Sequence, residues 1–375
     1  MIDTICLLIP KDKLLFLTTD DGPAWNLQSH TEEYDKFVRN PTKLQKESGH
    51  YYPRLTGYKR KYRDERNVKI EFSIPKIIYN NNLDEVGEKQ FDEIVNALKN
   101  RLGEMGIVAS EDAIKKSQVS SIHYSKNIIL EDGYTVNQVI SELNKIDLRK
   151  TFDFAKARFI NDGQSLYLHT TSHEFTIYDK LADMKKDKKR AIDKDQTMTQ
   201  RTLFNQISKK KTLNEVLRFE VRLGKKVKMD SLLEKLGYSK HMNFQELFKQ
   251  EISQKVVTHY WETLITERNL GLFTIQTTDK DLLRSIYRAM PKIKPNRAIY
   301  LTGLLTLAKD GNGMRELRSI LEKSSNSRTW FRIAKDVREL ASTLPSNLVR
   351  GWVKQIDTAL LNYKPLRIKD YEEIK

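Results

Sequence analysis

The chain has 375 residues, of which 39% are hydrophobic and 31% charged, so it can bury a sizeable core and form two or three domains. Its 66 lysines and arginines exceed its 50 acidic residues, giving a formal net charge of +16. A basic excess of this size indicates a polyanionic partner, nucleic acid or an anionic membrane, or else a lysine-rich solvated surface. The basic residues are spread along the chain, which favours a folded surface that follows a phosphate backbone.

Cys6 is the one cysteine, which excludes an internal disulfide and a cysteine zinc site and favours a reducing cytoplasm. The opening segment, residues 1–10, has a short apolar run with no basic region before it, so we expect a strand rather than a signal peptide. No run reaches the roughly 18 apolar residues of a membrane span. We therefore expect a soluble protein of the cytoplasm without membrane partners.

The first 80 residues are predicted to be rich in strands, with one at residues 4–9 and another at 67–74, where polar and apolar residues alternate. Between these strands, residues 51–63 interleave tyrosines with arginines and lysines. Such a stretch is able to stack bases and contact phosphates, or it forms a hairpin with a charged outer face; both interpretations stay open. Apolar residues at helical spacing predict a helix over residues 84–105.

The next region alternates strands and short helices. A helix after the turn Asp132-Gly133 and a hairpin through the short polar link at residues 170–172 are predicted. A highly charged stretch at residues 180–194 is expected to be a helix or a mobile loop beside the candidate site residues named below. The predicted elements are strands at 119–129, 165–169, 174–178 and 217–223, and a helix at 136–143.

Helical patterns dominate from about residue 230. The expected fold is α+β, with an antiparallel-leaning sheet domain followed by an all-α C-terminal region. We divide the chain into a catalytic part at 1–230, a helical extension at 231–290 and a helical region at 291–375. The predicted helices are 243–267, 279–290, 297–309, 314–322, 329–341 and 348–361.

Side-chain alternation along residues 217–223 places Arg218, Glu220 and Arg222 on one face of a strand. A carboxylate between two guanidiniums suits phosphate chemistry, because the carboxylate can hold a divalent metal and the arginines can clamp phosphate oxygens. A structural ion network on an exposed sheet face is the alternative.

Two further strands carry polar candidates. Tyr178 and Lys180 share a face at the end of one strand, where a nearby cation would favour the phenolate form of a tyrosine nucleophile. His123 lies on the polar face of residues 120–126 as a metal ligand, a proton carrier or a structural histidine. His169 and His173, which flank the hairpin link, are weaker candidates.

The segment from residue 297 to 341 predicts three helices in a helix-turn-helix-like order, with turn and N-cap residues at 324–328. In such a unit the last helix lies in the major groove of DNA. Arg328, Arg332 and Lys335, with Ser327, are the residues expected to contact DNA. A plain helical bundle with a basic surface is the alternative.

These motifs, in this order, resemble the replication initiator family of filamentous phages and related plasmids, the gene II/X type. The resemblance covers roughly residues 1–260, and the tyrosine and Arg-x-Glu strands are also similar to plasmid rolling-circle initiators of the Rep_trans type. The segments that carry it are Met1–Thr4, Phe72–Asn82, Val119–Ile129, Tyr178–Lys180, Leu217–Leu223 and Leu236–Tyr238.

The resemblance implies a metal-dependent, site-specific DNA nickase and strand-transferase that uses Mg²⁺ or Mn²⁺. Tyr178 falls on the nucleophilic tyrosine, which forms a 5′-phosphotyrosine and leaves a 3′-OH primer, and Glu220 falls on the metal-binding acid. His123 stands where relatives often carry aspartate, which departs from the expected ligand set. We expect Lys180, Arg218 and Arg222 to stabilise charge or position DNA.

The implied partners are origin DNA in double- and single-stranded form, and the host helicase and polymerase. The alternative function is a non-cutting origin-binding initiator that melts DNA and recruits host replication proteins. A related strand-transfer enzyme of a mobile element is a third. A nicked DNA product would distinguish the nickase from the non-cutting initiator.

Overall fold

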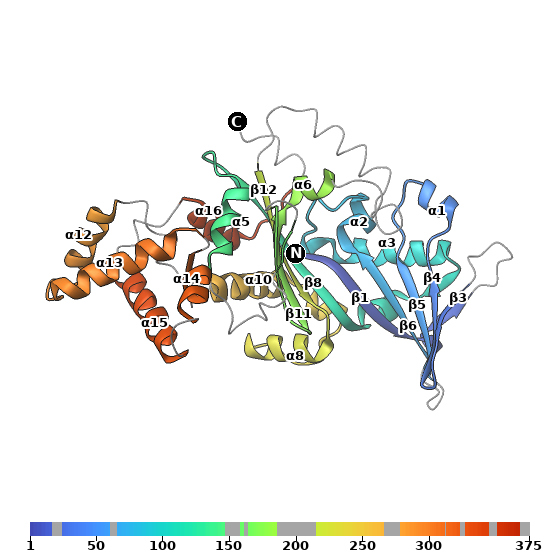
Figure 1. Cartoon of the computed structure of the whole chain (residues 1–375). Helices are drawn as coiled ribbons and strands as arrows, with labels where there is room; N and C mark the ends of the chain where they lie inside the picture. The colour runs from blue at the N-terminus through green and yellow to red at the C-terminus, as the bar shows by residue number, and fades with distance from the viewer. Residues whose placement is uncertain are drawn as a thin grey trace.

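The computed structural model describes residues 1–16, 25–60, 66–146, 158–160, 164–185, 215–265, 278–311, 313–322, 327–344 and 351–367. Ten of its described strands form one sheet, and every neighbouring pair in it is antiparallel (Figure 1). The α+β class with an antiparallel sheet is confirmed. Across the sheet the order is β3 (Asn26–His30), β4 (Tyr34–Arg39), β5 (Arg54–Arg60), β6 (Arg66–Ser73), β1 (Ile2–Pro10), β8 (Gln118–Leu130), β12 (Glu215–Leu223), β11 (His173–Asp179), β10 (Ser165–His169) and β9 (Arg158–Ile160).

One face of this sheet is apolar and packs against helices. In β12 the alternate residues Phe219 and Val221 are fully buried, and the Phe219 ring lies 5.2 Å from that of Trp261 in α10. The residues of this face and of the helices against it form one continuous core. The helices that contribute to it are α2 (Ile74–Tyr79), α3 (Phe91–Glu104), α4 (Glu111–Lys115), α5 (Val136–Asn144), α8 (Lys226–Lys235), α9 (Phe244–Leu247), α10 (Gln250–Ile265) and α16 (Gly351–Asn362).

Smaller elements complete the sheet end of the chain. They are the helices α1 (Lys43–Glu47) and α6 (Lys180–Lys185), the 3-10 turns at Lys11–Lys13 and Glu88–Gln90, and the strand pair β2 (Leu14–Phe16) and β7 (Ile107–Ala109). Helix α6 covers the start of the charged stretch expected at 180–194, and residues 186–194 lie outside the described residues.

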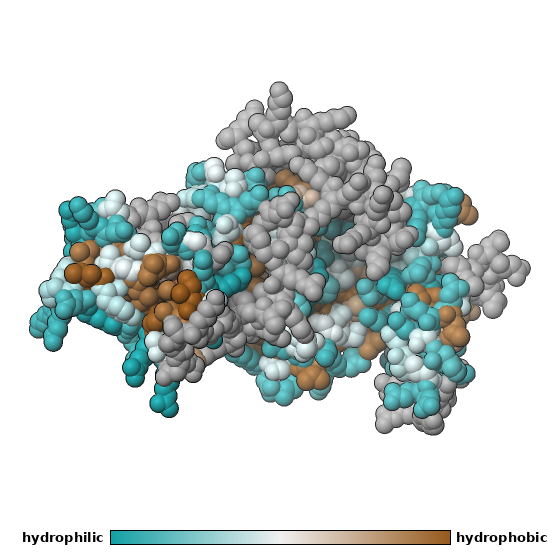
Figure 2. Space-filling model, in the orientation of Figure 1, coloured by the Kyte–Doolittle hydropathy of each residue, from teal (hydrophilic) through white to brown (hydrophobic). Residues whose placement is uncertain are grey.

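Four helices form a second core at one end of the molecule (Figure 1). The helices expected at 297–309, 314–322 and 329–341 are all present there. Figure 2 shows hydrophobic residues at the surface of this unit, where Ile299, Leu307 and Ile320 are each more than half exposed. The four helices are α12 (Asp279–Ala289), α13 (Pro295–Lys309), α14 (Gly313–Glu322) and α15 (Ser327–Thr343).

After this unit the chain returns to the sheet. The indole rings of Trp352 in α16 and Trp261 in α10 lie 6.5 Å apart, and the Trp261 Nε1–H donates to Asp357 at 2.7 Å. The core of the sheet therefore includes helices on both sides of the division expected near residue 230. None of the described helices combines the length and apolar composition that a bilayer crossing requires.

A buried ion pair ties the segment after α16 to the sheet. Lys126 of β8 donates from Nζ to Glu85 at 2.7 Å and to the Lys364 carbonyl at 2.7 Å. The Glu85 carboxylate also accepts from the backbone N–H groups of Asn127, at 2.6 Å, and Leu366, at 3.0 Å. Burial alone would raise the pKa of Glu85, but Lys126, the N-terminal amino group and the hydrogen bonds to the carboxylate together lower it.

Two helix predictions need correction. The helix expected over 84–105 begins at Phe91: the Asn81 side chain accepts from the backbone N–H groups of Leu83 and Asp84 and holds a turn, and residues 88–90 form a 3-10 turn directly before the helix. The helix expected over 243–267 is split into α9 and α10, since Phe248 leaves the helical conformation with φ −84° and ψ 56°.

Candidate active site

The three strands with polar candidates are neighbours in the sheet. β12 lies between β8 and β11, and its register places Arg218 beside both Tyr178 and Asn127. The same register places Arg222 beside His123. The structure therefore brings together, on the face opposite the helices, the side chains that alternation assigned to polar faces.

The Tyr178 hydroxyl donates a hydrogen bond to Glu220 Oε2 at 3.1 Å. The tyrosine is only 8% exposed, and burial, with the charge of Glu220, raises its pKa well above the ordinary value although Arg218 opposes this. Tyr178 is thus a neutral phenol near pH 7. We expected neighbouring cations to favour the phenolate. In the structure burial has the larger effect on the pKa and favours the neutral phenol.

Glu220 is an ionised carboxylate at the centre of the site. Its Oε1 accepts from Arg222 Nε at 2.8 Å and lies 3.4 Å from His123 Nδ1. Burial alone would raise its pKa, but Arg222 and His123 hold the pKa well below the ordinary value. One oxygen of Glu220 therefore faces the tyrosine and the other faces a cation and an imidazole.

Asp3 completes this cluster and was missed by the sequence analysis. A register shift between Ile2 and Thr4 marks a bulge in β1, and bulges re-aim side chains next to functional sites. Ligand atoms of Asp3, His123 and Glu220 all lie within 4.8 Å of one another. The one available sequence clue was an acid in a mostly apolar strand.

The donor set of Asp3, His123 and Glu220 fits a divalent metal. Two carboxylates with one imidazole suit Mn²⁺ well and Mg²⁺ less well, because magnesium prefers all-oxygen surroundings. The two carboxylates are also paired with Arg218 and Arg222, which balance their charge. These residues could hold one ion directly beside the Tyr178 hydroxyl.

The two arginines differ in access. Arg218 is 2% exposed and donates to Asp3 Oδ1 at 2.6 Å, Ser125 Oγ at 3.0 Å and Asn127 Oδ1 at 2.9 Å. Arg222 has a side chain 35% exposed and also lies 3.3 Å from Glu174. Arg218 therefore organises the interior of the site, whereas Arg222 can reach a bound molecule.

Lys180 lies beneath the tyrosine. Its Nζ is 5.9 Å from the centre of the Tyr178 ring, and the residue is 1% exposed. Burial, reinforced by the charge of Arg218, lowers the pKa of Lys180 to about 7. This lysine therefore changes its charge near neutral pH.

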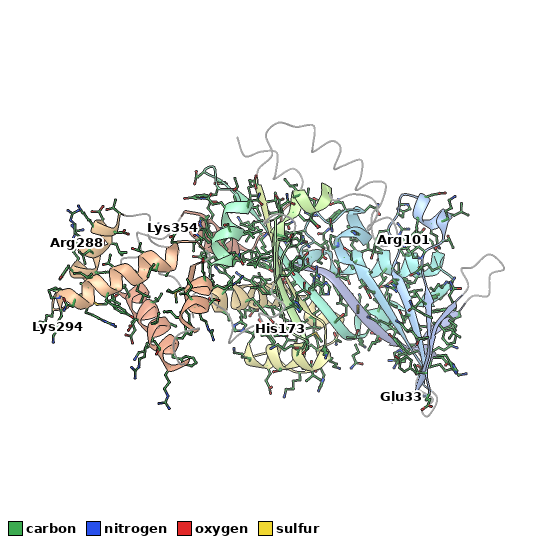
Figure 3. The ribbon with its side chains drawn as sticks, viewed as in Figure 1. Glu33, Arg101, His173, Arg288, Lys294 and Lys354 are labelled. Carbon is green, nitrogen blue, oxygen red and sulfur yellow. The ribbon has the colours of Figure 1, made fainter. Side chains whose placement is uncertain are left out.

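The structure separates His173 and the candidates of α15 from this cluster, whereas His169 lies opposite Glu174 on the face of the site. His173 lies at the opposite end of β11 from Tyr178 (Figure 3), with its ring 5.7 Å from that of Tyr260, and burial lowers its pKa to about 4. Arg328, Arg332 and Lys335 are exposed on α15, a helix of the four-helix unit, which lies away from the strands of the site (Figure 1). Their spacing puts all three on one side of the helix.

The whole chain was compared with models of protein families, with curated proteins and with solved structures. None of the three comparisons finds a match. The family resemblance therefore stays an expectation, and the residues of the site carry the chemical argument.

Proposed function

We propose that the protein is a rolling-circle replication initiator, a site-specific DNA nickase and strand-transferase. The observation that carries this proposal is the Tyr178 hydroxyl bound to Glu220 at the edge of the Asp3, His123 and Glu220 cluster. A nucleophile, an ionised acceptor and a metal-type donor set within one small volume suit phosphoryl transfer.

The proposed reaction is a transesterification. The Tyr178 oxygen attacks the scissile phosphorus, the bond from phosphorus to the 3′ oxygen breaks, and that oxygen takes up a proton from the solvent to become a 3′-OH. The tyrosine proton leaves toward Glu220 Oε2, the atom that already accepts it. The reverse attack by a 3′-OH restores the phosphodiester and releases Tyr178. A divalent ion held by Asp3, His123 and Glu220 would supply charge stabilisation at the phosphoryl oxygens.

The surrounding cations have distinct proposed roles. Arg222 contacts Glu220 and is accessible, so it can clamp a phosphate oxygen. Arg218 holds Asp3 in place. Lys180, buried against the Tyr178 ring, adds positive charge beside the attacking oxygen when protonated.

One assay tests the proposal. The protein is incubated with Mn²⁺ or Mg²⁺ and a supercoiled plasmid that carries the origin of its own replicon. We expect nicked circles with protein attached to the 5′ end, and a phosphotyrosyl peptide containing Tyr178 after digestion. Specific binding and melting without any nick would instead establish the non-cutting initiator that recruits the host helicase and polymerase.

The identity of the ligand at position 123 should set the metal preference. We expect His123→Asp to raise nicking in Mg²⁺ relative to Mn²⁺ by about tenfold, because an oxygen ligand replaces the imidazole. The measurement is the ratio of nicking rates in the two metals. His241→Asp, on an exposed histidine outside the cluster, is the control, and an unchanged ratio in both variants would remove His123 from the ligand set.

We further propose that helices α13 to α15 recognise origin duplex as a helix-turn-helix, with Arg328, Arg332 and Lys335 of α15 toward the DNA. Exposed cations on one side of the helix that follows two others support this geometry. Phe331, 42% exposed beside them, adds apolar surface on the same helix.

Removing Arg332 should weaken duplex binding. We expect Arg332→Ala to lower affinity for origin duplex by about 10-fold and to reduce the slope of log K against log salt by about 0.9, the effect of one phosphate contact. Lys354→Ala, on α16 and labelled in Figure 3, is the matched loss of one exposed cation and should change neither quantity. Equal losses in both variants would point to bulk charge rather than α15.

A further inference from the structure

The sheet face that carries the site continues beyond it toward β4. Cys6 of β1 pairs with Ser121 of β8 on one side and with Glu71 of β6 on the other. In antiparallel pairs, directly opposed residues share a face, so the face of His123 and Ser121 extends across β1 and β6. The described core residues of the sheet lie on the other face.

On β4, β5 and β6 this face is aromatic and basic. Lys36 of β4 lies directly opposite Tyr58 of β5, and the rings of Tyr34 and Tyr58 meet edge to face at 5.8 Å. Lys69 of β6 lies near Cys6, Glu71 and Tyr58, which together raise the pKa of the lysine against the opposing effect of burial. We name Tyr34, Lys36, Arg54, Tyr58 and Lys69 the aromatic–basic strip; all five are half-buried.

Two of the three cations of the strip are not paired with an acid among the residues that the structure describes. Neither Lys36 nor Arg54 has an ion pair or hydrogen bond with any residue that the structure describes, and the Arg54 Nε is a buried donor without an acceptor. Lys69 lies 3.5 Å from Glu71, the one acid placed among them by the register. The strip thus offers positive charge to an anionic partner.

The partner that fits this combination is single-stranded DNA. Tyrosine rings on an open sheet face can stack on bases, and bases are available for stacking only when they are unpaired. Lysine and arginine beside the rings can contact the phosphates that link those bases. From β12 to β4 there are five strand spacings of about 4.8 Å, or about 24 Å, which is room for several nucleotides.

We propose that the aromatic–basic strip binds the single strand that leads to Tyr178, so that the nucleotides beside the scissile phosphate lie across β1 and β6 and their neighbours stack on Tyr58 and Tyr34. This inference rests on the proposed function for its DNA substrate. In the aromatic and basic stretch at residues 51–63, Tyr58 points to the sheet face that carries the site, and Lys59 points to the other face.

The test measures binding without covalent capture. In a Tyr178→Phe background, anisotropy of a labelled oligothymidylate of about 16 nucleotides is followed at several salt concentrations. We expect Tyr58→Ala to weaken binding at least about fivefold, and Tyr58→Phe, which still stacks, to stay within about twofold of the parent. Lys36→Ala should reduce the salt slope by about 0.7, the value for one contact on a single strand.

Lys59→Ala is the matched control, because it removes one exposed cation from the strand next to Lys36 but on the other face of the sheet. The inference is overturned if the parent does not bind the oligonucleotide, if Tyr58→Ala binds as the parent does, if Lys59→Ala and Lys36→Ala have equal effects, or if duplex binding falls as much as single-strand binding. Failure of the proposed function appears separately: the protein with Tyr178 intact would form no adduct while the strip variants still lost single-strand affinity.

Discussion

Replacing Tyr178 by phenylalanine is expected to abolish the covalent protein–DNA adduct and to reduce nicking by at least about 10⁴-fold, since no other group takes over the attack. The substitution removes one oxygen atom and the hydrogen bond to Glu220 but keeps the ring that packs beside Lys180. The measurement is adduct formation on labelled origin DNA with Mn²⁺, together with origin binding, which should be unchanged.

Tyr167 supplies the matched control for this variant. It lies on the next strand, β10, opposite Thr176, and is half-buried on the same face of the sheet. Tyr167→Phe should retain adduct formation within about threefold, because its hydroxyl makes no bond to Glu220. An adduct formed by the Tyr178 variant but lost in the Tyr167 variant would move the nucleophile to β10.

Lys126→Met is expected to destabilise the protein by about 3 kcal/mol or more, because it leaves the Glu85 carboxylate buried without its cation. Both side chains are at most 3% exposed, so solvent cannot replace the lost partner. The measurement is the free energy of unfolding from denaturant titration. The double variant Lys126→Met with Glu85→Gln should recover part of the loss of stability, since neither side chain of the pair then carries a charge.

The exposed pair of Lys116 and Asp112 gives the control. Its side chains are 65% and 70% exposed, and Lys116→Met should change stability by no more than about 0.5 kcal/mol. A loss as small in Lys126→Met would show that the buried pair does not stabilise the sheet.

The same pair gives stability a pH dependence with a definite sign. The pKa of Glu85 is lower in the folded protein than its ordinary value of 4.5. Its ionised form therefore stabilises the fold above pH 4.5, and this contribution is lost as the pH falls below 4.5 through the lowered pKa. In Lys126→Met the part of this acid dependence that comes from the pair should be absent.

The sequence predicts the strands of the site well because alternation is a local property. The faces assigned to Tyr178, Glu220 and His123 agree with the register of β11, β12 and β8. Each assignment needed only a few neighbouring residues, and the burial of Phe219 and Val221 on the other face follows from the same period of two.

Features that depend on distant pairing were beyond sequence analysis. Asp3 enters the site only because β1 pairs with β8 through a bulge. No local sequence pattern predicts this register shift, because the two paired strands are far apart in the chain. The turn at Asn81 shortened a helix whose apolar spacing was otherwise regular. The packing of α16 against α10 likewise joins segments that no periodicity connects.

The return of α16 to the sheet makes the helices α12 to α15 an insertion rather than a tail. The chain leaves the sheet core from α10 and rejoins it at α16, and Trp261 and Trp352 touch near the ends where the inserted helices depart and return. A unit with two such close attachment points can be exchanged as a cassette while the sheet, its tyrosine and its carboxylates stay intact. Under the proposed function, such an exchange would change the origin that is recognised and leave the residues that cut it unchanged.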